Sequence, residues 1–352
     1  MSFRSETEFV RWLGRRWPQR GRGLELGIGD DAALIRLPAG RDLVLTTDLS
    51  IEDVHFRLDL HPPRSVGHHA LARSLSDLAA MGARPRFALL SLALRRGVTR
   101  SWITAFYDGL RALAQRFGVT LIGGDTAVVD TAATIDVIAI GEVERGHALL
   151  RSGARPGDRI YVTGRVGLSA LGLELLLGGA RPAVSALRSQ IKIGSRRVGT
   201  RNAVIEDALT RHLHPEPRCA AGIALADRKL ASAAIDVSDG FAADLARLCE
   251  SSRCGAVIRE ADLPLPPAGL PLRPTALGRD PLDLGLHGGE DYELVFTVPA
   301  ARAARVPRKI GGVTIRQVGE IQAGRRLSLR RADGRVIALD TRGYDHFRKL
   351  RV

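Results

Sequence analysis

Residues 235–251 read IDVSDGFAADLARLCES, which is an apolar strand pattern, a turn of Ser, Asp and Gly, and then apolar residues at helical spacing. The same alternation of strand and helix shapes the first half of the chain. There, strand patterns at 42–48 and 87–94 alternate with helical patterns at 64–81 and 99–117. Because helices that alternate with strands pack as layers on a sheet, we expect an α+β or α/β fold.

The length of the chain and one Gly- and Pro-rich segment indicate two domains. The chain has 352 residues, and a single hydrophobic core rarely grows beyond about 250–300 residues. The run RSGARPGD at 151–158 is typical of a segment between domains. We predict an N-terminal domain at 1–148 with a mixed sheet and helices, and a C-terminal α/β sandwich at 149–352. Residues 178–202 are Arg-rich with little periodicity and are predicted to form an irregular insertion.

The composition is that of a soluble globular protein, with 45% apolar and 26% charged residues. No apolar run approaches the roughly 20 residues that span a bilayer, and the N-terminus MSFRSETEFV lacks the apolar stretch of a secretory signal. We therefore expect a cytoplasmic protein with no membrane partner. The cysteines Cys219, Cys249 and Cys254 form no CxxC pair, so the sequence supports neither a disulfide framework nor a zinc knuckle.

The formal charge of +14 raises the question of a nucleic-acid partner, because Lys and Arg that neutralise phosphates drive such binding. Here the arginines are dispersed in pairs such as Arg15-Arg16 and Arg325-Arg326, and only 5% of the residues are aromatic. Solvated faces explain this distribution more simply than a binding surface does. We expect no specific nucleic-acid partner.

Aspartates recur along the chain in one setting, an apolar run followed by a Gly or small-residue turn and then a carboxylate. The motifs are GIGDD (27–31), TTD (46–48), SLSD (74–77), IGGD (122–125), IDVSDG (235–240) and GGED (288–291). Carboxylates that converge on one cleft repel one another unless divalent cations hold them. Mg²⁺ takes oxygen ligands, including hydroxyls beside carboxylates, and is often shared with phosphates. The recurrence therefore predicts a metal-dependent phosphate site.

Each motif alone also has a structural interpretation. A single Asp is as well explained by a turn or a helix cap, and a lone His55 is more often structural than a ligand. Arg151 can bind phosphate in a bidentate way or lie on the surface, and Tyr344 can stack on a heterocycle or anchor the C-terminus. No P-loop motif GxxxxGK[ST] occurs, so any phosphate site is of another kind.

Eight segments in order resemble the thiamine-monophosphate kinase family, within the superfamily of aminoimidazole ribonucleotide synthetase-like ATP enzymes. They are GIGDDAALI, TTDLSIEDVHF, SLSDLAAMGARP, LIGGDT, RSGARPGDRIYVTG, IDVSDGFAADL, GGEDYELVFT and GYDHF. The resemblance runs from about residue 5 to residue 347 and weakens across 178–202. It implies transfer of the ATP γ-phosphoryl group to thiamine monophosphate, and a homodimer that pairs through the N-terminal domain.

The resemblance also implies site residues. Matching positions hold several Mg²⁺ ions in that family, and here they are Asp30, Thr46, Thr47, Asp48, Asp77, Asp125, Asp236 and Asp239. Positions that contact ATP are Tyr107, Gly124, Asp125, Arg151 and Ser238, and those that contact the thiamine substrate are His55, Glu290 and Tyr344. The attacking group is a phosphate oxygen that is already ionised, so we expect no dedicated general base.

Related enzymes fit the sequence less well. Selenophosphate synthetases carry a reactive Cys or selenocysteine near the N-terminus, whereas the first Cys here is Cys219. The hydrogenase-maturation relative ends in a cysteine motif, but this chain ends HFRKLRV. An aminoimidazole ribonucleotide synthetase should lack DVHF and GYDHF. The non-enzyme alternatives are an Arg-rich nucleic-acid-binding protein and an inactive kinase, and carboxylates in every motif argue against the inactive kinase.

Overall fold

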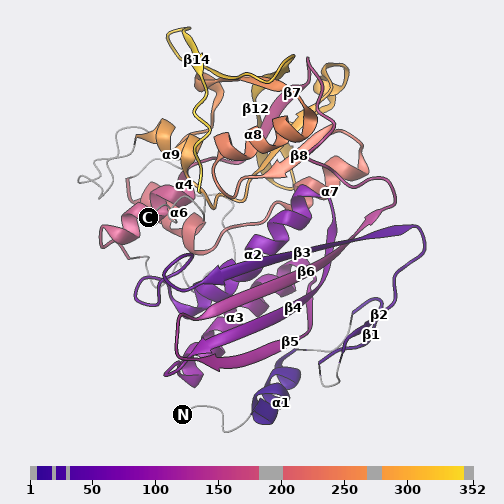
Figure 1. Ribbon diagram of the computed structural model, residues 1–352, viewed down its shortest axis with the longest axis vertical. Coiled ribbons are helices and arrows are strands. Elements are labelled where there is room, and N and C mark those ends of the chain that lie inside the picture. Colours follow the sequence, from indigo (N-terminus) through magenta and orange to yellow (C-terminus); the bar gives the residue numbers. More distant parts are fainter. Residues whose placement is uncertain (1–5, 18–20, 29–31, 182–200, 268–279, 345–352) are drawn as a thin grey trace. The chain divides into compact units, whose positions relative to one another are not determined.

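The computed structural model describes residues 6–17, 21–28, 32–181, 201–267 and 280–344, and most of the expected insertion at 178–202 lies outside them. The chain divides into two compact units, Met1–Ala148 and Leu149–Val352. Both units combine helices with a sheet, which confirms the predicted mixed fold (Figure 1). Within the described residues, none of the helices has the length and apolar character needed to cross a membrane.

The first unit is built on a four-stranded sheet in the order β3-β6-β4-β5. Its strands are β3 (Arg41–Ile51), β4 (Arg84–Arg95), β5 (Thr120–Val129) and β6 (Thr134–Glu144). β4 and β5 are parallel, and the other two pairings are antiparallel. The helices are α1 (Glu6–Arg16), α2 (Pro63–Ala80) and α3 (Arg100–Phe117), and a small hairpin joins β1 (Leu24–Leu26) to β2 (Leu34–Ile35). α2 packs on β3 and β6, and α3 packs on α2 (Figure 1).

Glycines let α2 and α3 touch through their backbones. A Cβ atom added to Gly67 would lie 1.9 Å from the carbonyl oxygen of Phe106, and one added to Gly109 would lie 1.8 Å from that of Arg64. α3 begins where Thr99 Oγ1 accepts a hydrogen bond from the Trp102 N–H at 3.2 Å. It ends at Gly118, whose φ of 67° is the left-handed cap expected at a helix stop. The helix predicted at 99–117 is confirmed.

Two of the acidic motifs lie inside strands, and for the GGD motif this corrects the expected turn. β3 continues to Ile51, so Thr46, Thr47 and Asp48 lie within it. β5 continues through Gly123-Gly124-Asp125, which is therefore not a turn, with a register shift opposite Ala88 and Leu89. The ladder to the neighbouring strand supplies the backbone hydrogen bonds, and this pairing outweighs the local turn preference of Gly and Asp.

The second unit holds an eight-stranded sheet in the order β14-β13-β9-β12-β7-β10-β8, with β11 beside β12. The strands are β7 (Arg159–Thr163), β8 (Ala233–Asp236), β9 (Gly255–Arg259), β10 (Leu294–Val298), β11 (Lys309–Ile310), β12 (Val313–Gln322), β13 (Leu327–Arg330) and β14 (Val336–Ala338). The helices are α4 (Leu168–Leu177), α6 (Arg201–Leu213), α7 (Cys219–Asp227), α8 (Phe241–Ser252) and α9 (Pro281–His287). Short 3₁₀ turns lie at Glu260–Asp262 and Ala300–Arg305. The paired strands are antiparallel apart from β9 and β13.

The strand–turn–helix segment at 235–251 contributes to the core of the second unit. Ile235 on β8 and Phe241 and Leu245 on α8 belong to one buried cluster with Val295 of β10 and Ile258 of β9. α7 ends at Asp227. The chain turns at Lys229, which has a φ of 50°, and the Leu230 N–H donates to the Leu225 carbonyl at 3.0 Å. Some short or irregular segments carry too few periodic residues to be predicted from sequence. The elements without a predicted counterpart are α1, β1, β2, α9, β11 and β13.

Candidate functional site

In the first unit, three of the predicted metal ligands lie between β3 and α2. Thr46 and Asp48 are on β3, on the face against which α2 packs, and Asp77 is on α2. The Thr46 hydroxyl donates a short hydrogen bond to Asp77 Oδ2. Arg73, also on α2, brings its Nε within 3.7 Å of Asp48 Oδ1. The Asp77 side chain therefore faces a polar group of β3.

Asp48 is held in an environment that does not favour its negative charge. Burial, together with the charge of Asp77, raises the pKa of Asp48 to about 6, although Arg73 and Ser74 act in the opposite direction. Its Oδ2 is buried and accepts no hydrogen bond from any described residue. A buried carboxylate oxygen with no donor is costly, and a divalent cation would satisfy it.

Two other predicted ligands of this unit, Thr47 and Asp125, lie on the opposite face of the sheet. Thr47 Oγ1 donates to Asp136 Oδ1 at 2.6 Å. The strand register places Asp136 opposite Ser91, and Ser91 opposite Asp125, so these three side chains share one face. Asp125 is exposed, and its Oδ1 accepts the N–H of Thr126 at 2.8 Å. Asp136 belongs to none of the acidic motifs, although an Asp within the apolar strand TIDVIAIG is a sequence signal for a functional carboxylate.

The oxygen atoms of the predicted ligands in the first unit are suitable ligands for a hard divalent cation. They are carboxylate and hydroxyl oxygens, which Mg²⁺ prefers, and Asp48 Oδ2 needs a positive partner. Over the part of the chain that the structure describes, no three acidic, His or Cys side chains come close enough together to hold a metal alone. A cation here would therefore need oxygens from a phosphate or from elsewhere in the chain. Asp30, another predicted ligand, lies outside the described residues.

Tyr107, expected to contact ATP, is enclosed by aromatic rings. It is 2% exposed, and the ring centroids of Phe9 and Trp12 on α1 lie 5.9 and 5.5 Å from its own. Burial raises the pKa of its hydroxyl far above the ordinary value. The ATP contact of Tyr107 stays a prediction.

Gly124 and His55 are held in defined conformations. Gly124 has a φ of 149°, and a Cβ atom there would lie 1.9 Å from the Leu90 carbonyl oxygen, so only glycine fits. His55 lies in the turn after β3, where its Nδ1 accepts the Ile51 N–H at 3.0 Å. In a neutral imidazole this places the proton on Nε2. The ATP contact of Gly124 and the substrate contact of His55 stay predictions.

In the second unit, the predicted ligand Asp236 is the last residue of β8, and the predicted ligand Asp239 lies in the loop between β8 and α8. The carboxylate of Asp244, on α8, accepts the N–H groups of Ser238 and Asp239 at 2.9 and 3.0 Å. Arg247 Nη1 lies 2.6 Å from Asp239 Oδ2 and 2.5 Å from Asp244 Oδ1. Burial and the nearby Asp239 raise the pKa of Asp244 to about 6, and Arg247 opposes the shift. Asp244 and Arg247 were not predicted, but their spacing of three in a helical pattern could have indicated a pair.

Two predicted substrate residues from distant motifs meet at this loop. The Glu290 N–H donates to the Ser238 carbonyl at 2.8 Å, and the Tyr344 N–H donates to the Asp239 carbonyl at 3.1 Å. The glycine before each of them makes the approach possible. A Cβ atom on Gly289 would lie 2.6 Å from the Ser238 oxygen, so the motif needs glycine there.

Arg151, predicted to contact ATP together with Ser238, lies elsewhere in this unit. Its carbonyl accepts the hydroxyl of Ser252 at 2.9 Å, at the C-terminal end of α8. Ser238 precedes the N-terminal end of the same helix. The 12 residues of α8, at about 1.5 Å each, separate the two ends. The structure therefore does not bring Arg151 and Ser238 together.

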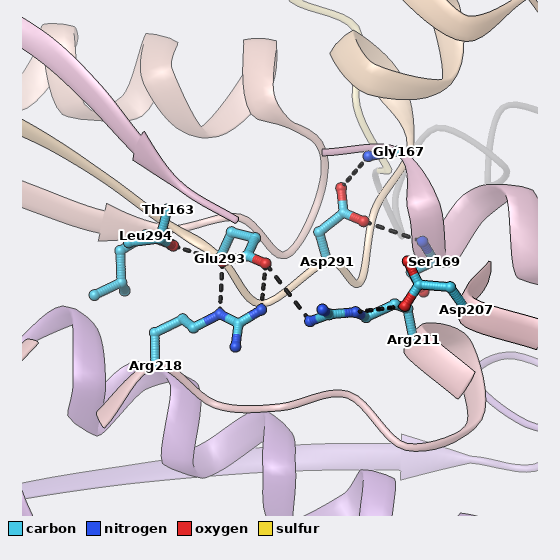
Figure 2. A network of polar contacts seen from close by, with 9 residues as sticks. All are labelled: Thr163, Gly167, Ser169, Asp207, Arg211, Arg218, Asp291, Glu293 and Leu294. Atoms are coloured by element: carbon cyan, nitrogen blue, oxygen red, sulfur yellow. Dashed lines mark hydrogen bonds and ion pairs between the residues drawn. The ribbon is translucent and has the colours of Figure 1, made fainter. Parts of the chain in front are cut away.

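Asp291, the last residue of the GGED motif, belongs to a network of polar contacts (Figure 2). Asp291 Oδ2 accepts the Gly167 N–H at 2.5 Å, and its Oδ1 accepts the Ser169 N–H at 3.1 Å. Burial raises the pKa of Asp291 to about 7, although these two hydrogen bonds oppose the shift. Two positions further on, Glu293 Oε2 accepts the Arg218 Nε–H at 2.6 Å, and a second, short hydrogen bond joins Arg218 Nη2 to Oε1.

Comparison with known proteins identifies the family of the chain. Residues 29–143 match the N-terminal domain of AIR synthase related proteins, and residues 155–331 match the C-terminal domain. Thiamine-monophosphate kinase of Escherichia coli strain K12 is 40% identical over 327 residues, which cover 92% of each chain. The chain belongs to the thiamine-monophosphate kinase family. It is therefore classed with ATP-dependent kinases.

Solved structures of this family have the same fold. Thiamine-monophosphate kinase from Stenotrophomonas maltophilia K279a is 36% identical, with a TM-score of 0.74 over 93% of this chain and 95% of that one. A structure of AaThiL complexed with AMPPCP and TMP is 29% identical, with a TM-score of 0.72 over 99% of both chains. That relative therefore holds an ATP analogue and TMP on a fold that this chain shares along its whole length.

Proposed function

We propose that this chain transfers the γ-phosphoryl group of ATP directly to thiamine monophosphate, giving thiamine diphosphate and ADP in a Mg²⁺-dependent reaction. The proposal is supported by membership of the thiamine-monophosphate kinase family, with 40% identity to the E. coli K12 member over 92% of both chains. The single structural observation that carries the metal requirement is Asp48, with its buried, unsatisfied Oδ2 close to Asp77. ATP and thiamine monophosphate are the small-molecule partners, and the cytoplasm is the proposed location.

Each unit carries carboxylates or hydroxyls that would hold Mg²⁺ ions. The proposed ligands are Asp30, Thr46, Thr47, Asp48, Asp77, Asp125, Asp236 and Asp239. When bound, Mg²⁺ would neutralise the phosphate charges and align the reacting oxygens. In the absence of metal, the hydrogen bond from Thr46 holds Asp77, and the ion pair with Arg247 holds Asp239. These contacts keep the acidic side chains in place despite their mutual repulsion.

The chain's own residues bind and orient the two reactants. The acceptor is a phosphate oxygen, already ionised at neutral pH, so no side chain has to remove a proton. We assign ATP contacts to Tyr107, Gly124, Asp125, Arg151 and Ser238, and substrate contacts to His55, Glu290 and Tyr344. Glu290 brings a carboxylate, which pairs favourably with the cationic thiazolium ring of thiamine. Asp244 fixes the Ser238–Asp239 loop by accepting both of its N–H groups.

We also propose a homodimer that forms through the outer face of β3. Leu43, Leu45 and Leu49 project from this edge strand and are 39%, 58% and 47% exposed. Alternate residues of a strand share one face, so the three leucines form a row. A row of exposed leucines on an edge strand is typical of a covered surface. A second copy of the chain is the proposed partner.

The reaction is tested by incubating the protein with Mg-ATP and thiamine monophosphate and separating the products by chromatography. We expect thiamine diphosphate and ADP in equal amounts. No thiamine diphosphate, together with turnover of an aminoimidazole precursor, would overturn the proposal. Omitting Mg²⁺ and adding a chelator should abolish the product, whereas full activity without any divalent cation would remove the metal from the mechanism.

A further inference from the structure

Glu290 has a backbone conformation that its surroundings must impose. Its φ is 63°, and that of Tyr292 two residues later is 49°. Residues other than glycine rarely adopt these left-handed angles, and they persist only where neighbouring structure over-determines them. Such strain is concentrated at ligand sites. The residues that hold this segment therefore influence the orientation in which Glu290 binds its ligand.

Asp291 attaches the segment to the first turn of α4. Its side chain is buried at 7% exposure, and its two oxygens accept the N–H groups of Gly167 and Ser169 (Figure 2). These N–H groups have no partner within the helix, because the first four of any helix do not. The two hydrogen bonds set the position and orientation of the peptide that follows Glu290.

The side chain of Glu290 is tied to the same turn through His212. His212 Nδ1 lies 3.2 Å from Ser169 Oγ and 3.8 Å from Glu290 Oε2. Ser169 thus uses its N–H to hold Asp291 and its hydroxyl to hold His212. One helical turn therefore fixes the backbone that follows Glu290 and places His212 near the Glu290 carboxylate.

A buried ion pair holds the C-terminal end of the segment, just before β10. Arg218 and Glu293 are 5% and 2% exposed and form two hydrogen bonds. Thr163 Oγ1 donates to Glu293 Oε2 at 2.6 Å and accepts the Leu294 N–H at 2.8 Å. Burial raises the pKa of Glu293, but the charge and hydrogen bonds of Arg218 outweigh it and hold the pKa below its ordinary value. The start of β10 is thereby anchored as well.

We propose that Asp291 is a positioning residue that pre-orients Glu290 for the thiamine substrate, supported by Ser169 and His212 on one side and by Glu293 and Arg218 on the other. The inference rests on the proposed function, in which Glu290 contacts thiamine monophosphate. A segment that is already ordered loses little conformational freedom on binding. Asp291 therefore contributes to substrate affinity without touching the substrate.

The variant Asp291→Asn tests this, because it keeps the size of the side chain but replaces one acceptor oxygen with a donor NH₂ group. We expect the KM for thiamine monophosphate to rise about 10-fold or more, with the KM for ATP changed less than about two-fold. The matched control is Asp158→Asn. Asp158 is also buried in the second unit, and it accepts a backbone N–H from Arg155 and the Ser232 hydroxyl. This control should leave both KM values close to those of the parent.

A double-mutant cycle separates positioning from a merely structural role. Glu290→Gln should itself raise the KM for thiamine monophosphate. If Asp291 acts through Glu290, the double variant should be no worse than Glu290→Gln alone, whereas independent effects would multiply. Multiplying effects, or equal rises in both KM values, would overturn the proposal. An unaltered protein that makes no thiamine diphosphate would instead refute the proposed function.

Hydrogen exchange gives a readout without turnover. In Asp291→Asn, the amides of residues 288–292 should exchange about 10-fold faster while the melting temperature of the protein is kept. Unchanged exchange would overturn the proposal. If the variant does not fold, Ser169→Ala takes its place, because it removes only the hydroxyl that holds His212. An unchanged KM for thiamine monophosphate in that variant would likewise overturn the proposal.

Discussion

At the scale of single residues, Asp48 shows how its surroundings change the acidity of a carboxylate. Burial and Asp77 raise its pKa from 3.8 to about 6. Between these values the folded chain binds a proton that the unfolded chain has released, so stability falls as the pH rises from about 4 to about 6. Above pH 6 the full penalty remains unless a cation compensates it. The buried charge of Asp48 therefore lowers the stability of the folded chain at neutral pH.

This leads to a prediction on pH and stability. The variant Asp48→Asn should be more stable than the parent in the presence of chelator at pH 8, by about 2 kcal/mol. The gain should shrink towards pH 4, where the parent carboxyl is protonated in the folded chain. Thermal unfolding at pH 4, 6 and 8 measures this difference. A gain that is equal at all three values would show that the charge of Asp48 is not its cause.

Turnover gives a second prediction at the residue scale. Asp48→Asn and Asp125→Asn should each lower kcat by roughly 100-fold or more with folding intact, because a neutral amide holds a cation poorly. Suitable controls are Asp42→Asn and Asp130→Asn, two exposed residues paired with Arg145 and Arg96. These controls should turn over normally. Near-normal kcat at saturating Mg²⁺ would remove Asp48 or Asp125 from the proposed metal site.

At the scale of elements, Gly67 and Gly109 allow close packing of α2 on α3. This packing positions α2, and with it Asp77. Because the Cβ of any other residue at Gly67 would meet the backbone oxygen of Phe106 at 1.9 Å, no side-chain adjustment relieves the clash. The two helices would have to separate. Asp77, on α2, would then lose its contact with Thr46 on β3.

We therefore predict that Gly67→Ala destabilises the protein by about 3 kcal/mol or more, as overpacking of a dense core does. Gly14→Ala on α1 is the matched control, since a Cβ there meets its nearest neighbour at 3.9 Å. That control should be neutral or stabilising by up to about 1 kcal/mol, because Ala favours helix. Urea unfolding measures both variants. Equal stabilities for them would contradict the close helix contact.

At the scale of the whole molecule, the proposed homodimer depends on the exposed leucines of β3. Leu45→Glu places a charge in the middle of this row and should convert a dimer into a monomer, because burying an unpaired charge is costly. Val336→Glu is the control, on β14 of the second unit, where the parent residue is 50% exposed. It should stay dimeric. Sedimentation at micromolar concentration tests this, and a monomeric parent protein would overturn the proposal.

The long periodic elements were predictable from sequence. The helix at Arg100–Phe117 has apolar residues at helical spacing between a Thr cap and a Gly stop, and these local signals act within a few residues of each other. Short strands such as β2 and β13 lack such periodicity. The GGD segment was predicted as a turn because its local preference is clear, but pairing with β4 made it a strand.

Sequence alone determined the alternation of strands and helices, the recurrence of acidic motifs and the resemblance to a kinase family, because each is written in local order and spacing. Tertiary structure alone decided which acidic side chains meet. It placed Asp48 beside Asp77, put Asp125 on the other face of the sheet, and joined Asp291 to the start of α4. These contacts depend on strand register and on helix packing between residues far apart in the chain. A one-residue shift in register would turn every side chain of a strand to the other face.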